Sequence, residues 1–141
     1  MIGSRLERLA PGQEMSERNM AQAAAALDAA KALLQLGLFE QSLTQAYDSA
    51  RKSATALLER QRLRSRAASS HRNTQDVLRH QMGSRIAKQF GTIRRTRHQQ
   101  EYATRDSPEV FEREASAAIA FAERLHGEIS IALPRVGPFP L

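Results

Sequence analysis

The sequence predicts an all-α fold, an antiparallel bundle of about five helices. Apolar residues recur at steps of three and four along most of the 141-residue chain, which is the spacing of a buried helical face. β-Branched residues are sparse until the C-terminus, and this composition disfavours a sheet. The apolar residues, 41% of the chain, are mainly Ala and Leu, whose surfaces suit closely packed helices.

The chain is expected to form one helical domain with two short irregular ends. A chain of 141 residues can bury about two-thirds of its unfolded surface in a single domain. Glycine and proline stand among charges near the N-terminus, so residues 1–15 are expected to form a flexible arm. Residues 16–133 are expected to form the bundle, and residues 134–141, with three prolines, an irregular tail.

Two long helices begin the predicted bundle. The first is expected to run from an N-cap at Ser16 to about Leu36, where Gly37 supplies a C-terminal stop. Because the break is short, the second helix is expected to return antiparallel, from about Phe39 to Arg66. The predicted core positions are Met20, Ala23, Ala24, Leu27, Ala30 and Leu34, then Phe39, Leu43, Ala46, Tyr47, Ala50, Ala54, Leu57 and Leu58.

Three further helices are predicted. A short helix over about residues 73–81 is followed by a turn at Gly83 and a fourth helix over about residues 85–103. The fifth helix is predicted to begin with Ser107 as its N-cap and Pro108 in its first turn. Its predicted core positions are Val110, Phe111, Ala115, Ala118, Ile119, Ala122, Leu125 and Ile129.

The formal net charge of +6 favours an anionic partner, of which nucleic acid is the commonest. Basic residues are densest towards the end of the second predicted helix. An alternative is that these arginines form a solvated face that complements the helix dipole. The predicted nucleic-acid-binding residues are Arg60, Arg62, Arg64 and Arg66, with Arg95 on the fourth helix.

The composition excludes several other classes of protein. The chain has no Cys, so it forms no disulfide, thiolate metal site or cysteine nucleophile. His, Asp and Glu do not show metal-ligand spacing, and no metal or cofactor is expected. No apolar run approaches the ~20 residues that span a bilayer, and the N-terminus lacks an apolar signal core. A cytoplasmic location without membrane association is therefore expected.

One stretch of the fourth predicted helix departs from its apolar pattern. Phe90 and Ile93 belong to an apolar stripe, and the same steps continue to Arg97 and Glu101. Unpaired charges are costly to bury, so these two must be paired or face a cleft or a partner chain. Their spacing of four residues allows an ion pair on the helix, which the hydroxyl of Tyr102 is expected to cap.

The order of these features resembles the HEPN family, the higher eukaryotes and prokaryotes nucleotide-binding domains, over about residues 20–131. One carrier is Leu34-x-x-Gly37-x-Phe39-Glu40 between the first two helices, with Tyr47 after it. Two others are Ser70-His71 before the third helix and Arg97-His98-Gln99-Gln100-Glu101-Tyr102 in the fourth.

The resemblance implies a helical bundle that commonly dimerises, so that the polar motifs of two subunits face a shared cleft. Many family members are metal-independent RNA endonucleases of toxin–antitoxin or anti-phage systems, in which an Arg precedes a His by four to six intervening residues. Here Arg94 and His98 have three residues between them. Other members act with nucleotidyltransferase partners, and the set Arg97, Glu101 and Tyr102 is typical of members not known to cleave RNA.

Three functional hypotheses follow. The leading one is a toxin–antitoxin or defence component that acts through RNA or through a nucleotidyltransferase-like partner. The second is a non-catalytic dimerisation module in which Arg97, Glu101 and Tyr102 hold an interface. The third is an endoribonuclease in which His98 acts as general acid or base, its ordinary pKa being near 6.5, and Arg94 or Arg97 holds the phosphate.

Overall fold

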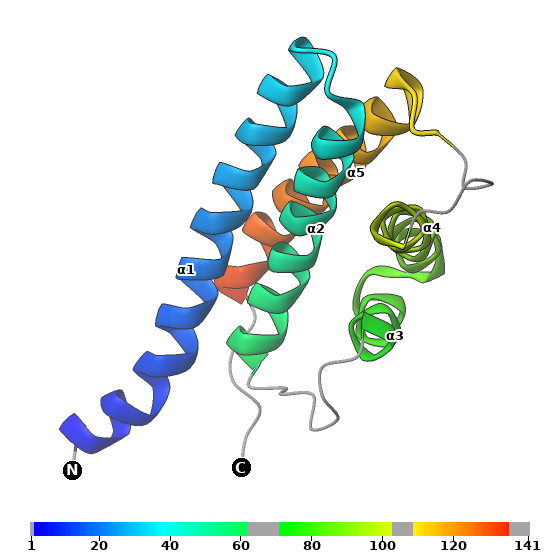
Figure 1. Cartoon of the computed structure of the whole chain (residues 1–141). Coiled ribbons are helices and arrows are strands. Elements are labelled where there is room, and N and C mark those ends of the chain that lie inside the picture. The colour runs from blue at the N-terminus through cyan, green and yellow to red at the C-terminus, as the bar shows by residue number, and fades with distance from the viewer. Residues whose placement is uncertain (1, 62–70, 103–108, 136–141) are drawn as a thin grey trace.

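The computed structural model describes residues 2–61, 71–102 and 109–135, and the statements below refer to these residues. They contain five α-helices and one 3₁₀ turn, and no strand (Figure 1). The predicted all-α bundle of about five helices is therefore confirmed. The elements are α1 (Ile2–Gln35), α2 (Phe39–Gln61), α3 (His71–Met82), α4 (Ser84–Glu101), α5 (Glu112–Ala132) and η1 (Leu133–Arg135).

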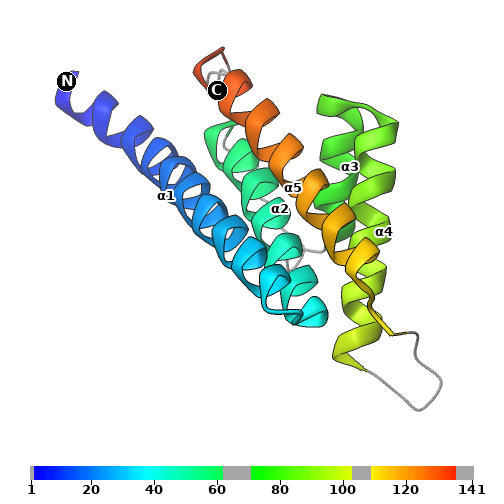
Figure 2. The same cartoon turned by 90° about the horizontal axis from the view of Figure 1, so that it is seen from above.

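The helix α2 is the centre of the bundle, because it contacts each of the other four helices. The helices α1 and α2 lie side by side and antiparallel, and α5 packs behind them (Figure 1). The pair α3–α4 lies on the other side of α2. This pair is seen nearly end-on in Figure 1 and lengthwise in Figure 2, so it crosses α2 steeply.

The turn between α1 and α2 is the one that the sequence predicts. Gly37 has a φ of 75°, a left-handed conformation that glycine adopts without steric cost. The amide of Gly37 donates to the carbonyl of Leu34 at 3.0 Å, and the amide of Leu38 donates to that of Leu33 at 2.9 Å. These two bonds form a Schellman motif, which ends α1 and lets α2 begin at Phe39.

The predicted start of the first helix is wrong. The helix α1 begins at Ile2 rather than at Ser16, so residues 2–15 of the expected arm are helical. The hydroxyl of Ser16 is buried and donates to the carbonyl oxygen of Ala56 on α2 at 2.9 Å. The sequence predicts Ser16 as the N-cap of its own helix, whereas in the structure its side chain links α1 to α2.

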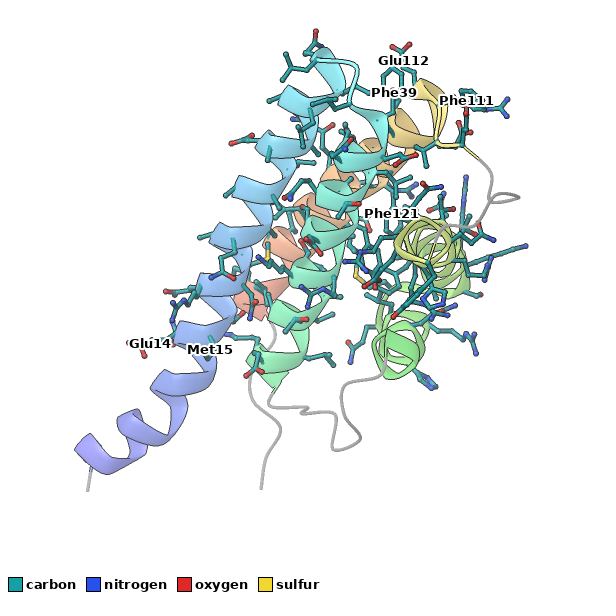
Figure 3. All side chains as sticks on the ribbon, viewed as in Figure 1. Glu14, Met15, Phe39, Phe111, Glu112 and Phe121 are labelled. Carbon is teal, nitrogen blue, oxygen red and sulfur yellow. The ribbon has the colours of Figure 1, made fainter. Side chains whose placement is uncertain are left out.

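The predicted start of the fifth helix is also wrong. Glu109 and Val110 are not helical, and α5 begins at Glu112 after Phe111. Val110 is 7% exposed, and an extended backbone at Phe111, with ψ of 171°, places successive side chains on opposite sides. Phe111 is therefore 54% exposed instead of buried (Figure 3). The predicted cap residues 107 and 108 lie outside the described residues.

The other boundaries agree with the predictions to within two or three residues where they are described. The predicted turn is present at Gly83, with φ of 98°, between α3 and α4. The described part of α2 ends at Gln61, so residues 62–66 of the predicted helix lie outside it. Pro134 lies in η1 and is not irregular as expected, while residues 136–141 of the predicted tail are not described.

The predicted helical faces form one hydrophobic core. Buried side chains from all five helices belong to a single cluster, among them Leu43, Phe90 and Leu125. Of the predicted core positions named above, Phe111 alone is exposed. Four buried serines also lie in the interior, and the apolar pattern did not predict them: Ser16, Ser42, Ser49 and Ser53.

Candidate functional site

Tyr47 is the centre of a polar face between α2 and α4. This residue is 2% exposed, and its ring centroid lies 5.7 Å from that of Phe90 on α4. The guanidinium carbon of Arg97 lies 5.6 Å from the Tyr47 centroid on the outer side of the core, which is a cation–π contact. Arg97 can occupy a position in the apolar stripe of α4 because its guanidinium group covers the ring of Tyr47.

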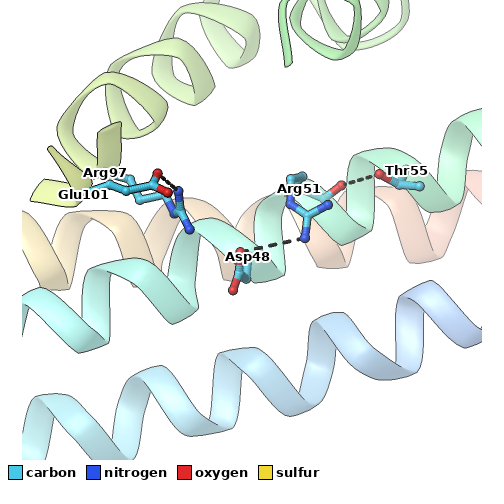
Figure 4. Close-up of polar contacts among 5 residues, drawn as sticks. All are labelled: Asp48, Arg51, Thr55, Arg97 and Glu101. Carbon is cyan, nitrogen blue, oxygen red and sulfur yellow. Dashed lines mark hydrogen bonds and ion pairs between the residues drawn. The ribbon is translucent and has the colours of Figure 1, made fainter. Parts of the chain in front are cut away.

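The ion pair that the spacing predicts is present. The Nη1 atom of Arg97 donates to the Oε2 atom of Glu101 at 2.6 Å, and both side chains project from α4 towards α2 (Figure 4). The pair is partly exposed, with side-chain exposures of 32% and 48%. Glu101 is the last residue of α4, where the helix dipole disfavours an acid. Its ion pair with Arg97 one turn earlier offsets this effect.

Two further cations surround the Tyr47 phenol. Burial raises the pKa of Tyr47 to about 12, and the positive charges of Arg51, Arg94 and Arg97 oppose this rise. These opposing charges come from both helices, Arg51 from α2 and Arg94 and Arg97 from α4. Arg51 is balanced in part by Asp48, whose Oδ1 atom lies 3.8 Å from an Arg51 nitrogen (Figure 4). Arg97 is likewise paired with Glu101, so the three arginines and two carboxylates of this cluster carry a formal net charge of +1.

Two of these arginines have donors without acceptors. The Nε atoms of Arg94 and Arg97 are buried, and neither has a hydrogen-bond partner in the part of the chain that the structure describes. A buried donor that lacks an acceptor costs roughly 1–3 kcal/mol. Guanidinium groups match the oxygens of phosphate and carboxylate in geometry and charge. An anion rich in oxygen can reach the exposed parts of these two side chains, while the Nε atoms themselves are covered.

His98 and Tyr102 lie apart from this cluster. Their rings contact each other with centroids 4.8 Å apart, and Tyr102 is 65% exposed. The expectation that the Tyr102 hydroxyl caps the pair of Arg97 and Glu101 is wrong, because Tyr102 follows the last turn of α4 and its ring lies on His98. His98 is exposed as well, so its ring is accessible from solvent.

A polar pocket of about 340 Å³, here called the α2–α4 pocket, opens beside Arg97. It lies between the first two turns of α2 and the last turn of α4. All seven lining residues have polar or charged side chains, although their carbon atoms make up more of the exposed wall than their nitrogen and oxygen atoms do. The lining residues are Glu40, Gln41, Thr44, Gln45, Arg97, Gln100 and Glu101.

The predicted basic surface is only partly described. Arg60 lies 13 residues after Tyr47 on α2, about 20 Å along the helix axis, so it does not belong to the Tyr47 cluster. Arg95 is exposed on α4 and donates to the hydroxyl of Thr92 at 3.3 Å. The structure does not describe Arg62, Arg64 and Arg66, so their role in nucleic-acid binding stays a prediction.

Neither a candidate metal site nor a candidate membrane span is present among the described residues. They contain no group of three or more His, Cys, Asp or Glu side chains that could hold a metal ion. None of the described helices is both long and apolar enough to cross a membrane.

Sequence reasoning missed several residues of this site. The sequence predicts Tyr47 as a core position and as part of the family motif, but not as a site residue. It predicts neither Arg51 nor the α2 residues of the α2–α4 pocket in the site. The signal for Arg51 was its spacing of four from Tyr47 on a face that is otherwise apolar. Gln41 and Gln45 are also four residues apart, but glutamines at this spacing are too common on helices to indicate a site.

The fold and the site together define a class: a helical bundle with a basic, arginine-lined face across two of its helices. The family model of the HEPN domain matches residues 16–131, which is most of the chain. The chain therefore belongs to the HEPN domain family, and the resemblance seen in its motifs is confirmed. This places it among helical modules associated with nucleotides and RNA. No curated protein matches the sequence.

Proposed function

We propose that this protein is a cytoplasmic HEPN component of a toxin–antitoxin or defence system and that it binds RNA across the α2–α4 face. Arg94 and Arg97 act as the phosphate ligands. The observation that carries the proposal is that Arg94 and Arg97, three residues apart on α4, are both partly exposed, Arg97 with 32% of its side chain accessible. A phosphate oxygen can accept hydrogen bonds from the exposed nitrogens of these guanidinium groups.

The site also favours a second candidate, a non-catalytic interaction module. The ion pair of Arg97 with Glu101 and its contact with Tyr47 would fix α4 on α2 without any ligand. In that case the same face joins a second copy of the chain or a nucleotidyltransferase-like partner. The two candidates differ in what Arg94 does, because Arg94 takes no part in the ion pair.

RNA binding is tested by fluorescence anisotropy with a labelled 12-nucleotide RNA at several salt concentrations. Replacing both Arg94 and Arg97 by Ala is expected to weaken binding at least about tenfold, since each charge-assisted hydrogen bond contributes roughly 1.5–3 kcal/mol. The slope of log K against log salt should fall by about 0.7 for each lost phosphate contact. Arg113→Ala with Arg124→Ala removes equal charge from α5 and serves as control. Equal binding by both double variants would contradict the proposal.

Cleavage is tested separately, because an accessible His98 one turn from Arg94 allows the endoribonuclease alternative. If expression arrests growth and His98→Ala relieves the arrest while the protein stays folded, the histidine takes part in catalysis. Intact RNA after incubation with the wild-type protein, together with binding that depends on Arg94, would exclude cleavage and leave RNA binding as the function.

A further inference from the structure

The α2–α4 pocket contains hydrogen-bonding groups that the fold does not use. The side chains of Glu40, Gln41 and Gln45 form no hydrogen bond or ion pair with any other residue in the described part of the chain. The hydroxyl of Thr44 donates to the carbonyl oxygen of Glu40 at 3.1 Å and keeps its acceptor capacity. Four neighbouring side chains on one helix face thus present amide donors, amide acceptors and a carboxylate to the same space.

The pocket also has a flat cationic wall. Arg97 lines the pocket, and its guanidinium carbon lies 5.6 Å from the centroid of the Tyr47 ring. The guanidinium group is also paired with Glu101 (Figure 4). Tyr47 is itself held by Phe90, so the arginine rests on a buried aromatic pair. Unpaired bases stack on guanidinium planes as well as on aromatic rings. A planar ligand on Arg97 therefore meets a surface that is already positioned.

The volume of the α2–α4 pocket agrees with a ligand of the size of one nucleobase with its sugar. About 340 Å³ lies at the lower end of the range of roughly 300–1,000 Å³ for small-molecule pockets. A single nucleobase with its sugar fits this description better than an extended peptide does. The pocket lies next to the phosphate ligands Arg94 and Arg97, so a nucleotide bound through its phosphate has its base within reach of the pocket.

Two carboxylates line the α2–α4 pocket and favour bases that present hydrogen-bond donors. Glu40 and Glu101 present carboxylate oxygens at the pocket, which accept hydrogen bonds and repel other acceptors. Adenine, cytosine and guanine carry an exocyclic amino group, a donor that carboxylates and glutamine amides recognise. Uracil has a carbonyl oxygen in the corresponding place.

From these observations we infer that the α2–α4 pocket binds a nucleobase with an exocyclic amino group, stacked on Arg97 and recognised by Gln41, Gln45 and Glu40. The inference rests on the proposed RNA-binding function and adds a base preference to it. The same base chemistry is present in an RNA strand and in a free nucleotide, and the experiment distinguishes the two sources.

The experiment compares four probes on the full-length protein: 12-nucleotide oligo(A) and oligo(U) RNA, AMP and UMP. Wild-type protein is expected to bind oligo(A) about tenfold more tightly than oligo(U), as expected for one well-recognised base edge. Gln41→Ala with Gln45→Ala should bring the ratio close to one and leave the salt slope unchanged, because no phosphate contact is lost. Gln22→Ala with Gln99→Ala, which replaces two exposed glutamines elsewhere, should keep the preference.

The outcomes separate the pocket from the proposed function. Equal affinity of the wild type for oligo(A) and oligo(U), or a preference that survives the double substitution at Gln41 and Gln45, overturns the pocket assignment. If the double variant Arg94→Ala with Arg97→Ala still binds RNA more weakly when the pocket assignment fails, the proposed RNA-binding function stands without the base preference. Binding of AMP over UMP without binding of oligo(A) assigns the pocket to a free nucleotide and overturns the RNA function. Binding of none of the four probes overturns both proposals.

Discussion

The two faces of α2 are built in opposite ways. The face towards α1 is closed by small residues at steps of three and four, so the two helices pack closely. Two of its serine hydroxyls donate to carbonyl oxygens of α1 at 2.7 Å, Ser42 to Ala30 and Ser49 to Ala23. Ser16 of α1 donates in the other direction, to Ala56. We call this contact the α1–α2 seam.

The face towards α4 is wider and more polar. It contains Tyr47 with a cation over its ring, buried arginine donors that have no acceptor among the described residues, and an open pocket beside them. The α1–α2 seam has most of its polar atoms satisfied within the chain, with Ser53 Oγ as an exception in the described part. The difference teaches that the α1–α2 seam is closed and mostly paired within the chain, whereas the face of α2 towards α4 keeps polar side chains in an open pocket.

The largest expected effect is that of removing the aromatic support under this face. Phe90 is fully buried and contacts Tyr47, so Phe90→Ala should lower the free energy of unfolding by about 3–5 kcal/mol. Chemical denaturation measures this change. Phe111→Ala, at a residue that is 54% exposed, is the matched control and should change stability far less. Similar losses in the two variants would show that Phe90 is not part of the core.

The next effect concerns pH. The ordinary Tyr pKa is 10.0 and that of Tyr47 is about 12, so the unfolded phenol ionises first as the pH rises. The stability that Tyr47 contributes is complete below pH 10 and is lost as the pH rises through 12, a change of about 2–3 kcal/mol. In denaturation curves measured between pH 10 and 12, Tyr47→Phe should lack the fall in the free energy of unfolding that ionisation of this phenol causes.

Tyr102→Phe is the control for the pH experiment. Tyr102 is 65% exposed, so its phenol meets solvent in the folded and the unfolded state alike, and the decline should match that of the wild type. If the decline between pH 10 and 12 is the same with and without Tyr47, the phenol is not buried as described.

The smallest expected effect lies in the α1–α2 seam. Ser49→Ala removes one buried hydrogen bond to Ala23 and should lower the free energy of unfolding by about 1 kcal/mol. RNA affinity should stay unchanged, because the seam faces away from the arginines. Ser130→Ala on α5, whose hydroxyl donates within its own helix and is exposed, should cost less. A loss of RNA binding in the Ser49 variant would contradict the division between the two faces.

The periodic positions of the helices were predictable because a helix places residues of one face at fixed sequence steps. Ala23, Leu43, Phe90 and Leu125 are buried for this local reason. The stop at Gly37 was predictable as well, since its backbone conformation favours glycine. The cap at Ser16 failed as a prediction because α1 begins at Ile2, and the predicted start of the fifth helix was wrong because α5 begins at Glu112.

The candidate site was predictable only along one helix. The pairing of Arg97 with Glu101 follows from their spacing of four residues and is observed. The contact of Arg97 with Tyr47 joins residues 50 positions apart in the sequence and depends on how α4 crosses α2. For the same reason the sequence did not indicate that Tyr102 lies on His98 instead of capping the ion pair.

The amino-acid sequence by itself determined the helical class, the buried face of each helix and the family, because helical periodicity and short motifs are local properties of the chain. The tertiary structure alone decided that Tyr47 lies under Arg97, with the arginines around it and the α2–α4 pocket beside it. The physical reason is that these contacts depend on the packing of α4 across α2, which side chains from distant parts of the chain set together.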